Sequence, residues 1–195
     1  NLLTRSGRIG HLELTRRDPG FAATVDRFFA GRPATLVAPP PLFAPLGQRA
    51  LTLANRVALA AGAEDDATDG HLAGAAAGRL AAAAAAGAGV VVSELVAVAP
   101  DGRVTPGTPG LWADDHAGPW AEAARQVGAH GSALALRLGH AGRRGATRPR
   151  RTGVDRPLPG GGWPLLAASA IAYTPASPVP KAMDAGDLER VAGQF

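Results

Sequence analysis

Two stretches of this chain each begin as a short apolar run and then break abruptly into polar and glycine-rich residues. The first spans Val90–Trp112 and the second spans Gly131–Gly145. In a parallel α/β fold, a buried strand that delivers a loop at its carboxyl end has this pattern, because helices cover both faces of the sheet. The two stretches therefore predict neighbouring strands of a parallel sheet, each followed by a loop that can carry function.

The rest of the chain extends this alternation of strand and helix. The predicted strands are residues 56–61, 89–95 and 133–138, and the predicted helices between them are residues 71–86 and 115–129. Gly87 ends the first helix, and Trp120, Ala124 and Val127 should face the sheet from the second. Asp184 should cap a third helix near the end of the chain. This order favours an α/β fold with a parallel sheet.

Length and composition set further bounds. The chain has 195 residues, whereas a complete eightfold β/α barrel needs about 250. It begins at Asn1 and stops inside a predicted helix, so we expect an internal fragment. The absence of cysteine excludes disulfides and thiolate metal sites. No apolar run reaches the 18 residues or so of a membrane span, and we expect a cytoplasmic protein without membrane contact.

The first thirty residues read as a separate unit. Asp18 and Pro19 form a helix start, and the apolar residues that follow, Phe21, Val25 and Phe28, recur at helical spacing. Gly31 supplies a stop, and the proline-rich residues 32–41 predict a semi-stiff linker.

Residues 93–107 read SELVAVAPDGRVTPG, and residues 136–145 read LRLGHAGRRG. In this order they resemble two motifs of the old yellow enzyme family, the FMN-dependent ene-reductases. Residues 42–57 are similar to the family's opening hairpin, and residues 168–173 to its PSAIPY segment. The resemblance implies that residues 42–195 form the N-terminal portion of a (β/α)8 TIM barrel, preceded by a short helical segment.

The residues before the barrel carry a second resemblance. Residues 5–11 and 17–21 are similar to the end of the FAD monooxygenase half in salicylyl-CoA 5-hydroxylase fusions, in which an old yellow enzyme-like half follows. This implies that residues 1–31 are the tail of an upstream, FAD-dependent domain in a bifunctional protein of aromatic degradation. The alternative is an unrelated N-terminal helix.

The family resemblance also implies a reaction and a set of binding residues. Hydride would pass from NADH or NADPH to FMN and then to an activated alkene or an aromatic CoA thioester. The positions that correspond to the family's flavin contacts are Ala60, Ala61, Ala63, Leu95 and Arg137. The family's catalytic residues belong further along the chain, so we expect none within these 195 residues, no activity of this piece alone, and no metal site.

Two of these positions depart from the family pattern. Ala63 and its neighbours lack the polar side chains that normally tune the flavin ring, so any contact there must come from backbone amides. Arg137 replaces a glutamine, and it either contacts the flavin or pairs with Glu94 inside the barrel. His140 and Arg143 keep the family's HAGR motif, in which they mainly shape the loop. A rival reading follows from the altered positions: a barrel half that has lost FMN and serves as a structural or docking module.

Charge adds a further constraint. The formal net charge is +4, and Lys181 is the single lysine, so the basic character comes from arginine. Six arginines crowd residues 143–156. They lack interleaved aromatic residues, so we expect a solvated loop, with contact to an anionic substrate as the alternative and no nucleic-acid partner. We also expect His11, His71, His116 and His130 to be solvated or to flank helices. The sequence leaves open whether the protein forms a homo-oligomer.

Overall fold

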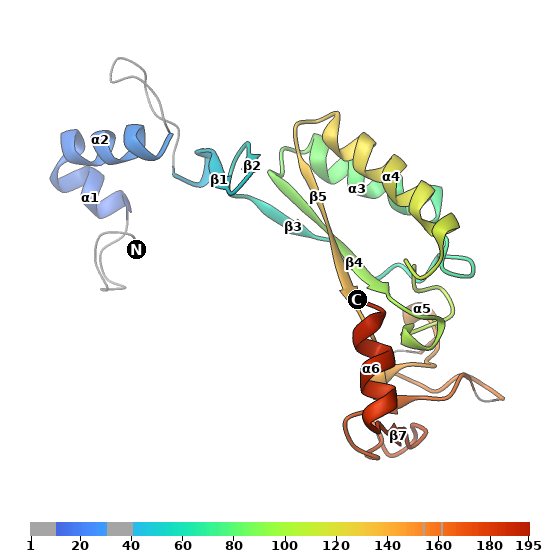
Figure 1. The fold of residues 1–195 in the computed structure, drawn as a ribbon. Coiled ribbons are helices and arrows are strands. Elements are labelled where there is room, and N and C mark those ends of the chain that lie inside the picture. Colours follow the sequence, from blue (N-terminus) through green and yellow to red (C-terminus); the bar gives the residue numbers. More distant parts are fainter. Residues whose placement is uncertain (1–10, 31–40, 154, 161) are drawn as a thin grey trace.

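The structure is a computed structural model that describes residues 11–30, 41–153, 155–160 and 162–195 (Figure 1). Gly31 and nearly all of the predicted linker lie outside these residues. Two helices precede it, α1 (His11–Arg17) and α2 (Pro19–Ala30), and they pack on each other. The predicted start of α2 is confirmed, because Asp18 Oδ1 accepts a hydrogen bond from the Phe21 backbone N–H at 2.9 Å.

The central sheet has three parallel strands, β3 (Ala58–Ala60), β4 (Val90–Ala97) and β5 (Ala133–Gly139), in that order. Helix α3 (Gly74–Ala85) connects the first two strands, and α4 (Asp114–Gly128) connects the second and third. Both helices cover the same face of the sheet, as Figure 1 shows. The predicted alternation of strands and helices is therefore confirmed.

A small antiparallel hairpin, β1 (Leu46–Gln48) with β2 (Leu51–Leu53), leads into the sheet. Asn55 anchors the chain between this hairpin and the sheet. Its Nδ2 donates to the Gly87 carbonyl at 2.9 Å, and its Oδ1 accepts from the Val57 N–H at 2.9 Å. The hairpin is thereby fixed near the amino end of the strands, opposite the end where barrel enzymes place their chemistry.

The main core lies between the helix pair and the sheet. Trp120, Val127 and Val91 are buried there, and the Trp120 indole N–H donates to the Gly110 carbonyl at 3.0 Å. The prediction that Ala124 faces the sheet is wrong: Ala124 is exposed, and Ala123 is fully buried in its place. Trp120, Ala123 and Val127 stand at i, i+3 and i+7, which share one face of a 3.6-residue helix.

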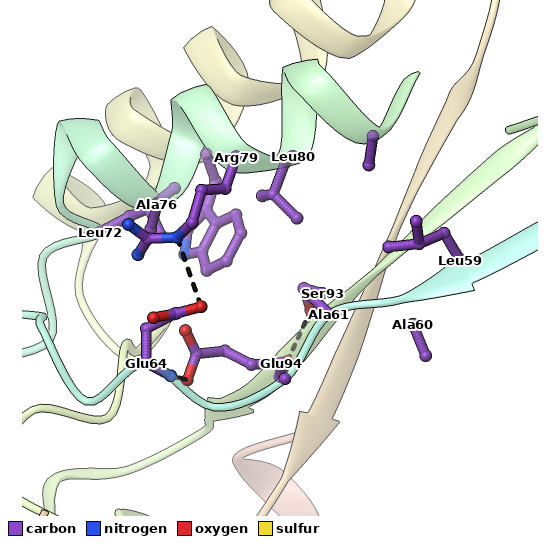
Figure 2. A pocket seen from close by; sticks show the side chains of 13 residues that line it. Leu59, Ala60, Ala61, Glu64, Leu72, Ala76, Arg79, Leu80, Ser93 and Glu94 are labelled. Atoms are coloured by element: carbon purple, nitrogen blue, oxygen red, sulfur yellow. Dashed lines mark hydrogen bonds and ion pairs between the residues drawn. The ribbon is translucent and has the colours of Figure 1, made fainter. Parts of the chain in front are cut away.

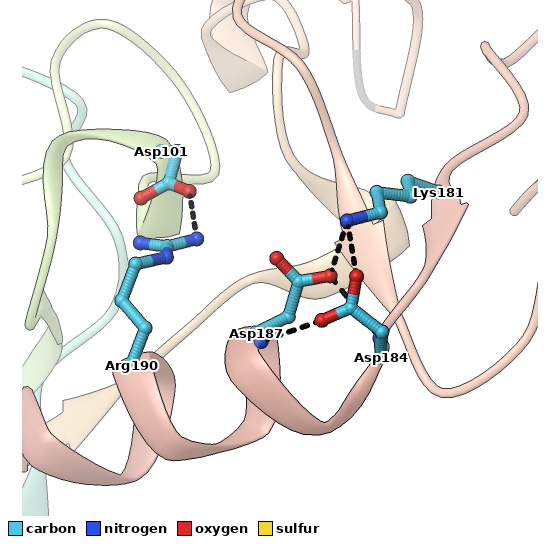
Figure 3. Close-up of polar contacts among 5 residues, drawn as sticks. All are labelled: Asp101, Lys181, Asp184, Asp187 and Arg190. Atoms are coloured by element: carbon cyan, nitrogen blue, oxygen red, sulfur yellow. Dashed lines mark hydrogen bonds and ion pairs between the residues drawn. The ribbon is translucent and has the colours of Figure 1, made fainter.

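The chain after β5 is built from short elements. They are the 3-10 turn η3 (Gly142–Arg144), α5 (Arg150–Gly153), the parallel pair β6 (Leu166–Ala167) and β7 (Lys181–Ala182), and α6 (Ala185–Gly193). Asp184 caps α6 as predicted, in a reciprocal capping box with Asp187. Figure 3 shows Lys181 bonded to both of these carboxylates.

Helix α6 is tied back to the sheet end by one ion pair. Arg190 Nη2 lies 2.9 Å from Asp101 Oδ2, in the 3-10 turn η2 (Pro100–Gly102) that follows β4 (Figure 3). Within the described ranges, no helix is both long and apolar enough to cross a bilayer.

Candidate functional site

The carboxyl ends of β3, β4 and β5 open into one cavity of about 310 Å³. Four of the five sequence-predicted flavin contacts line it: Ala61, Ala63, Leu95 and Arg137. Leu95 and Arg137 are partners in the β4–β5 register, which places them side by side at the strand ends. The fifth, Ala60, lines a neighbouring cavity of about 280 Å³ between β3 and α3, shown in Figure 2. Ala61 and Glu94 border both cavities.

A bulge in β4 shapes the wall between the two cavities. The β4–β5 register shifts between Val92 and Leu95, so Ser93 and Glu94 lie outside the regular ladder. The buried Ser93 hydroxyl occupies the gap: it donates to the Glu94 carbonyl at 2.7 Å and accepts from the Arg137 N–H at 3.0 Å. The bulge thus turns the Glu94 side chain toward the loop that follows β3.

Glu94 is a carboxyl group buried beside other acidic residues. Its side chain points toward Glu64 in Figure 2, and Glu94 Oε2 accepts the Glu64 backbone N–H at 3.3 Å. Burial raises the pKa of Glu94 to about 7, with smaller contributions from nearby Asp66, Asp65 and Glu64, while the bond from the Glu64 amide opposes the rise. The raised pKa is the pattern that marks candidate functional sites.

Arg137 does not pair with Glu94. Among the residues that the structure describes, no ion pair joins the two side chains, and the exposed Arg137 guanidinium lines the 310 Å³ cavity without a carboxylate partner. The interpretation of Arg137 as an internal ion-pair partner is therefore wrong. Its position in the cavity wall matches the other interpretation, a ligand contact.

Asp65 is a site residue that the sequence reasoning missed. It is buried in the loop after β3 with a left-handed backbone, at φ 57°. Its Oδ1 accepts from the Thr105 hydroxyl at 2.7 Å, and its Oδ2 accepts from the Arg150 N–H at 2.8 Å. Gly107 packs so closely that an added Cβ would lie 2.0 Å from the Asp65 carbonyl oxygen. One carboxylate thus joins the loops that follow all three strands.

The HAGR motif has a structural role, as predicted. The His140 side chain is largely buried, and its Nδ1 accepts the Gly142 N–H at 3.1 Å, which closes the turn η3. Burial lowers the pKa of His140; Asp101, whose Oδ1 lies 3.8 Å from Nε2, opposes this effect, and Arg190 adds to it. A neutral imidazole that holds a turn fits the prediction that His140 shapes the loop.

The prediction that His116 is solvated or flanks a helix is wrong, because the side chain is buried and the residue lies within α4. His116 is 3% exposed inside the first turn of α4. With His71 and Asp115 it brings together three groups of the kind that bind metals. However, His116 Nδ1 accepts the Trp112 N–H at 3.4 Å, so Nε2 carries the proton and donates it to the Asp69 carbonyl at 3.2 Å. Both ring nitrogens are engaged, and we assign this cluster to packing.

The arginine-rich loop is only partly solvated. Arg144, Arg148 and Arg150 line the 310 Å³ cavity. Arg144 Nε lies 2.7 Å from Asp155 Oδ1, and this ion pair neutralises the guanidinium. Arg144 Cζ lies 5.4 Å from the centre of the Tyr173 ring. Arg148 donates to the Pro157 carbonyl at 3.2 Å, a neutral acceptor. In the described part of the chain, no carboxylate pairs with the guanidinium of Arg148 or Arg150, so the cavity keeps an excess of positive charge.

Parallel strands whose carboxyl ends share one cavity, with the connecting helices on one face of the sheet, are typical of the barrel-type class of α/β proteins. The family model described as "NADH:flavin oxidoreductase / NADH oxidase family" matches residues 41–195. The chain therefore belongs to this family, and the resemblance to old yellow enzymes is confirmed.

Individual relatives agree with this assignment. The NADPH dehydrogenase of Geobacillus thermodenitrificans is 31% identical over 164 residues, which are 79% of this chain and 42% of that protein. Among solved structures, morphinone reductase is 26% identical with a TM-score of 0.64, over 80% of this chain and 42% of its own. A complex of 2-naphthoyl-CoA reductase with 2-naphthoyl-CoA gives a TM-score of 0.67 at 21% identity, over 79% of this chain and 24% of its own. The chain thus spans less than half the length of these proteins, and only part of a barrel is visible.

Proposed function

We propose that the chain supplies part of the FMN cavity of an NAD(P)H-dependent oxidoreductase of the old yellow enzyme type, which reduces an activated alkene. One observation carries the proposal: Ala61, Ala63, Leu95 and Arg137, separated in sequence, line the same cavity at the carboxyl ends of the strands. This is the end where barrel enzymes bind ligands and perform chemistry. When bound, FMN would carry the hydride between the nicotinamide and the alkene.

The residues present fit FMN. Ala61, Gly62 and Ala63 have small side chains that leave one wall of the cavity open to a flat ring. Among the described residues, the Gly62 and Ala63 amides have no hydrogen-bond partner, so they are free to donate to a ligand. Arg137 would hold the cofactor by donating to a ring oxygen, and a guanidinium favours negative charge in the reduced ring. Because Ala61, Gly62 and Ala63 lack polar side chains, their hydrogen bonds to FMN must come from backbone amides.

We call the full-length protein that contains these 195 residues the parent. The flavin content of the purified parent tests this function. We expect a yellow protein with a flavin absorbance band, FMN in the acid extract, and oxidation of NADH or NADPH that depends on an alkene acceptor. A colourless protein that does not take up added FMN would contradict the proposal. That result would favour the second candidate, a barrel half that serves as a structural or docking module, for which the altered loop after β3 is the supporting observation.

The charge of the cavity supports an anionic substrate, so among the activated substrates of this class we propose an aromatic CoA thioester rather than a neutral enone. Arg137, Arg148 and Arg150 line the cavity without a carboxylate partner in the described ranges. Guanidinium groups recognise phosphate oxygens well because their N–H donors form a planar fork. Turnover of an aromatic CoA thioester should then be competed by free CoA and weakened by salt, whereas turnover of a neutral enone should not be weakened by salt.

We expect no tight nucleic-acid binding by the loop of residues 143–156. Its arginines are divided between the cavity, an ion pair with Asp155 and a backbone carbonyl, so they form no continuous stripe along a groove. Fluorescence anisotropy with labelled DNA and RNA should show no sub-micromolar affinity. Tight binding that collapses between low and moderate salt would contradict this prediction, because multiple phosphate contacts produce that dependence.

The organisation of the whole protein is also a proposal. We propose that residues 1–31 end an upstream FAD-dependent monooxygenase domain and that residues 42–195 belong to the FMN-dependent half of the same bifunctional chain. The supporting features are the resemblance of residues 5–11 and 17–21 and the exposed apolar side chains of Phe21 and Phe28 on α2, which an adjoining domain would cover. Equal amounts of extracted FAD and FMN from the parent would support this organisation, and FMN alone would contradict it.

A further inference from the structure

Glu94 occupies a distinctive place in the structure, on the wall that separates the two cavities at the strand ends. It borders the 310 Å³ cavity together with Arg137 and the 280 Å³ cavity together with Arg79. The residue is 6% exposed. The proposed function gives this carboxyl group no role.

The guanidinium of Arg79, which lines the 280 Å³ cavity with Glu94, is engaged by other carboxylates. Figure 2 shows Arg79 above Glu64, with Arg79 Nε 3.4 Å from Glu64 Oε1. Arg79 Nη2 lies 2.6 Å from Asp66 Oδ2. The carboxyl group of Glu94 accepts a single hydrogen bond among the described residues, from the Glu64 amide to Oε2.

The other charged groups that face Glu94 are mainly acidic. Glu64, Asp65 and Asp66, all in the loop after β3, act on it electrostatically. The positive groups on the two cavity walls are Arg79, from α3, Arg137, from β5, and three arginines from the chain after β5, Arg144, Arg148 and Arg150. Among the described residues, none of them forms an ion pair with Glu94, although Glu94 acts electrostatically on Arg79. A buried carboxylate without a cation is costly, so it gains a proton easily.

We propose that Glu94 is a proton-accepting positioning residue of the flavin cavity, which binds a proton from solvent when reduction brings negative charge into that cavity. This inference rests on the proposed function. The electrons and the hydride come from the reduced nicotinamide, and the extra proton comes from water, so Glu94 changes charge without forming any other bond. Neutral Glu94 favours reduction, whereas ionised Glu94 opposes it.

The consequence is a pH dependence of the reduction potential of bound FMN. Near neutral pH, the uptake of one extra proton per two electrons should steepen the fall of the potential with pH. The added slope should be about 30 mV per pH unit, the two-electron equivalent of a tenfold change. In Glu94→Gln the amide stays neutral, so this added slope should be lost. The two proteins should have similar potentials in mild acid and diverge in mild alkali, where the wild type has the lower potential.

The experiment is a potentiometric titration of the FMN-loaded, full-length parent across this pH range, with Glu94→Gln and Glu64→Gln in parallel. Glu64 is the matched control, since it is an acidic residue of the adjoining loop but is exposed and paired with Arg79. Glu64→Gln should keep the steeper region. A second readout needs no flavin: the infrared band of a protonated carboxyl group in the apoprotein should disappear above neutral pH and be absent from Glu94→Gln.

If the reduction potential falls with pH at the same slope in the wild type and in Glu94→Gln, and both proteins bind FMN normally, this inference is overturned and the proposed function stays intact. Loss of the steeper region in Glu64→Gln as well would also overturn it, because the effect would then belong to the loop as a whole. Failure of the wild type to bind FMN would overturn both.

Discussion

Replacing Asp65 with alanine should lower the free energy of unfolding by about 3–5 kcal/mol and weaken FMN binding. The substitution removes both acceptors of the buried carboxylate, and bonds to charged groups contribute about 1.5–3 kcal/mol each. The buried Thr105 hydroxyl loses its 2.7 Å acceptor and keeps a longer contact of 3.4 Å with the Thr108 hydroxyl. The left-handed backbone at this position adds roughly 1 kcal/mol, because alanine disfavours it. Denaturant unfolding of the full-length parent, followed by flavin titration, measures both effects.

Two further variants separate the causes. Asp65→Asn keeps one acceptor and tolerates the left-handed backbone, so it should cost clearly less than Asp65→Ala. Asp66→Ala, at the next position, removes a half-buried carboxylate that pairs with the exposed Arg79, and it should cost about 1 kcal/mol or less. Equal losses in Asp65→Ala and Asp66→Ala would mean that the three loops are not held together by Asp65.

The sequence was sufficient for the order of the three sheet strands, the helices between them and α6, because each of these signals is local. Asp18 and Asp184 cap helices through bonds to residues three positions away, and Gly87 ends α3 with φ 98°. Periodicity was less reliable where alanine is abundant: Ala123 and Ala124 are chemically identical, and only the placement of Trp120 and Val127 decides which is buried.

The site was predictable in part, because parallel strands bring their carboxyl ends to one edge of a sheet. The family resemblance supplied Ala60, Ala61, Ala63, Leu95 and Arg137, and the geometry of parallel strands explains why all of them but Ala60 line the same cavity. The sequence reasoning missed Asp65, whose partners lie 40 and 85 residues away in sequence. One of its two interpretations of Arg137, an ion pair with Glu94, is not seen in the structure, because the bulge at Ser93 redirects the Glu94 side chain and no local pattern encodes that bulge.

Replacing Arg137 with alanine should weaken FMN binding by about 1.5–3 kcal/mol, the usual contribution of a charge-assisted hydrogen bond, which is roughly 10- to 150-fold in affinity. It should also lower the reduction potential of the bound flavin, because a positive charge that favours the reduced ring is lost. Thermal stability should change little, since the Arg137 side chain has no ion-pair partner in the described part of the chain. Fluorescence titration with FMN, potentiometry and a melting curve give the three values.

Arg143→Ala is the matched control for Arg137→Ala. Like Arg137 of β5, Arg143 is an exposed arginine, but it lies in η3 and lines a separate cavity of about 500 Å³, so its loss should leave FMN affinity and potential unchanged. Arg137→Gln should recover part of the affinity, because an amide can donate to a ring oxygen and also accept from a ring N–H, which a guanidinium cannot. Unchanged flavin binding in Arg137→Ala together with a lower melting temperature would contradict the cofactor role. Arg137 would then stabilise the sheet edge instead, and FMN would depend on the amides of Gly62 and Ala63 and on groups from the remainder of the parent protein.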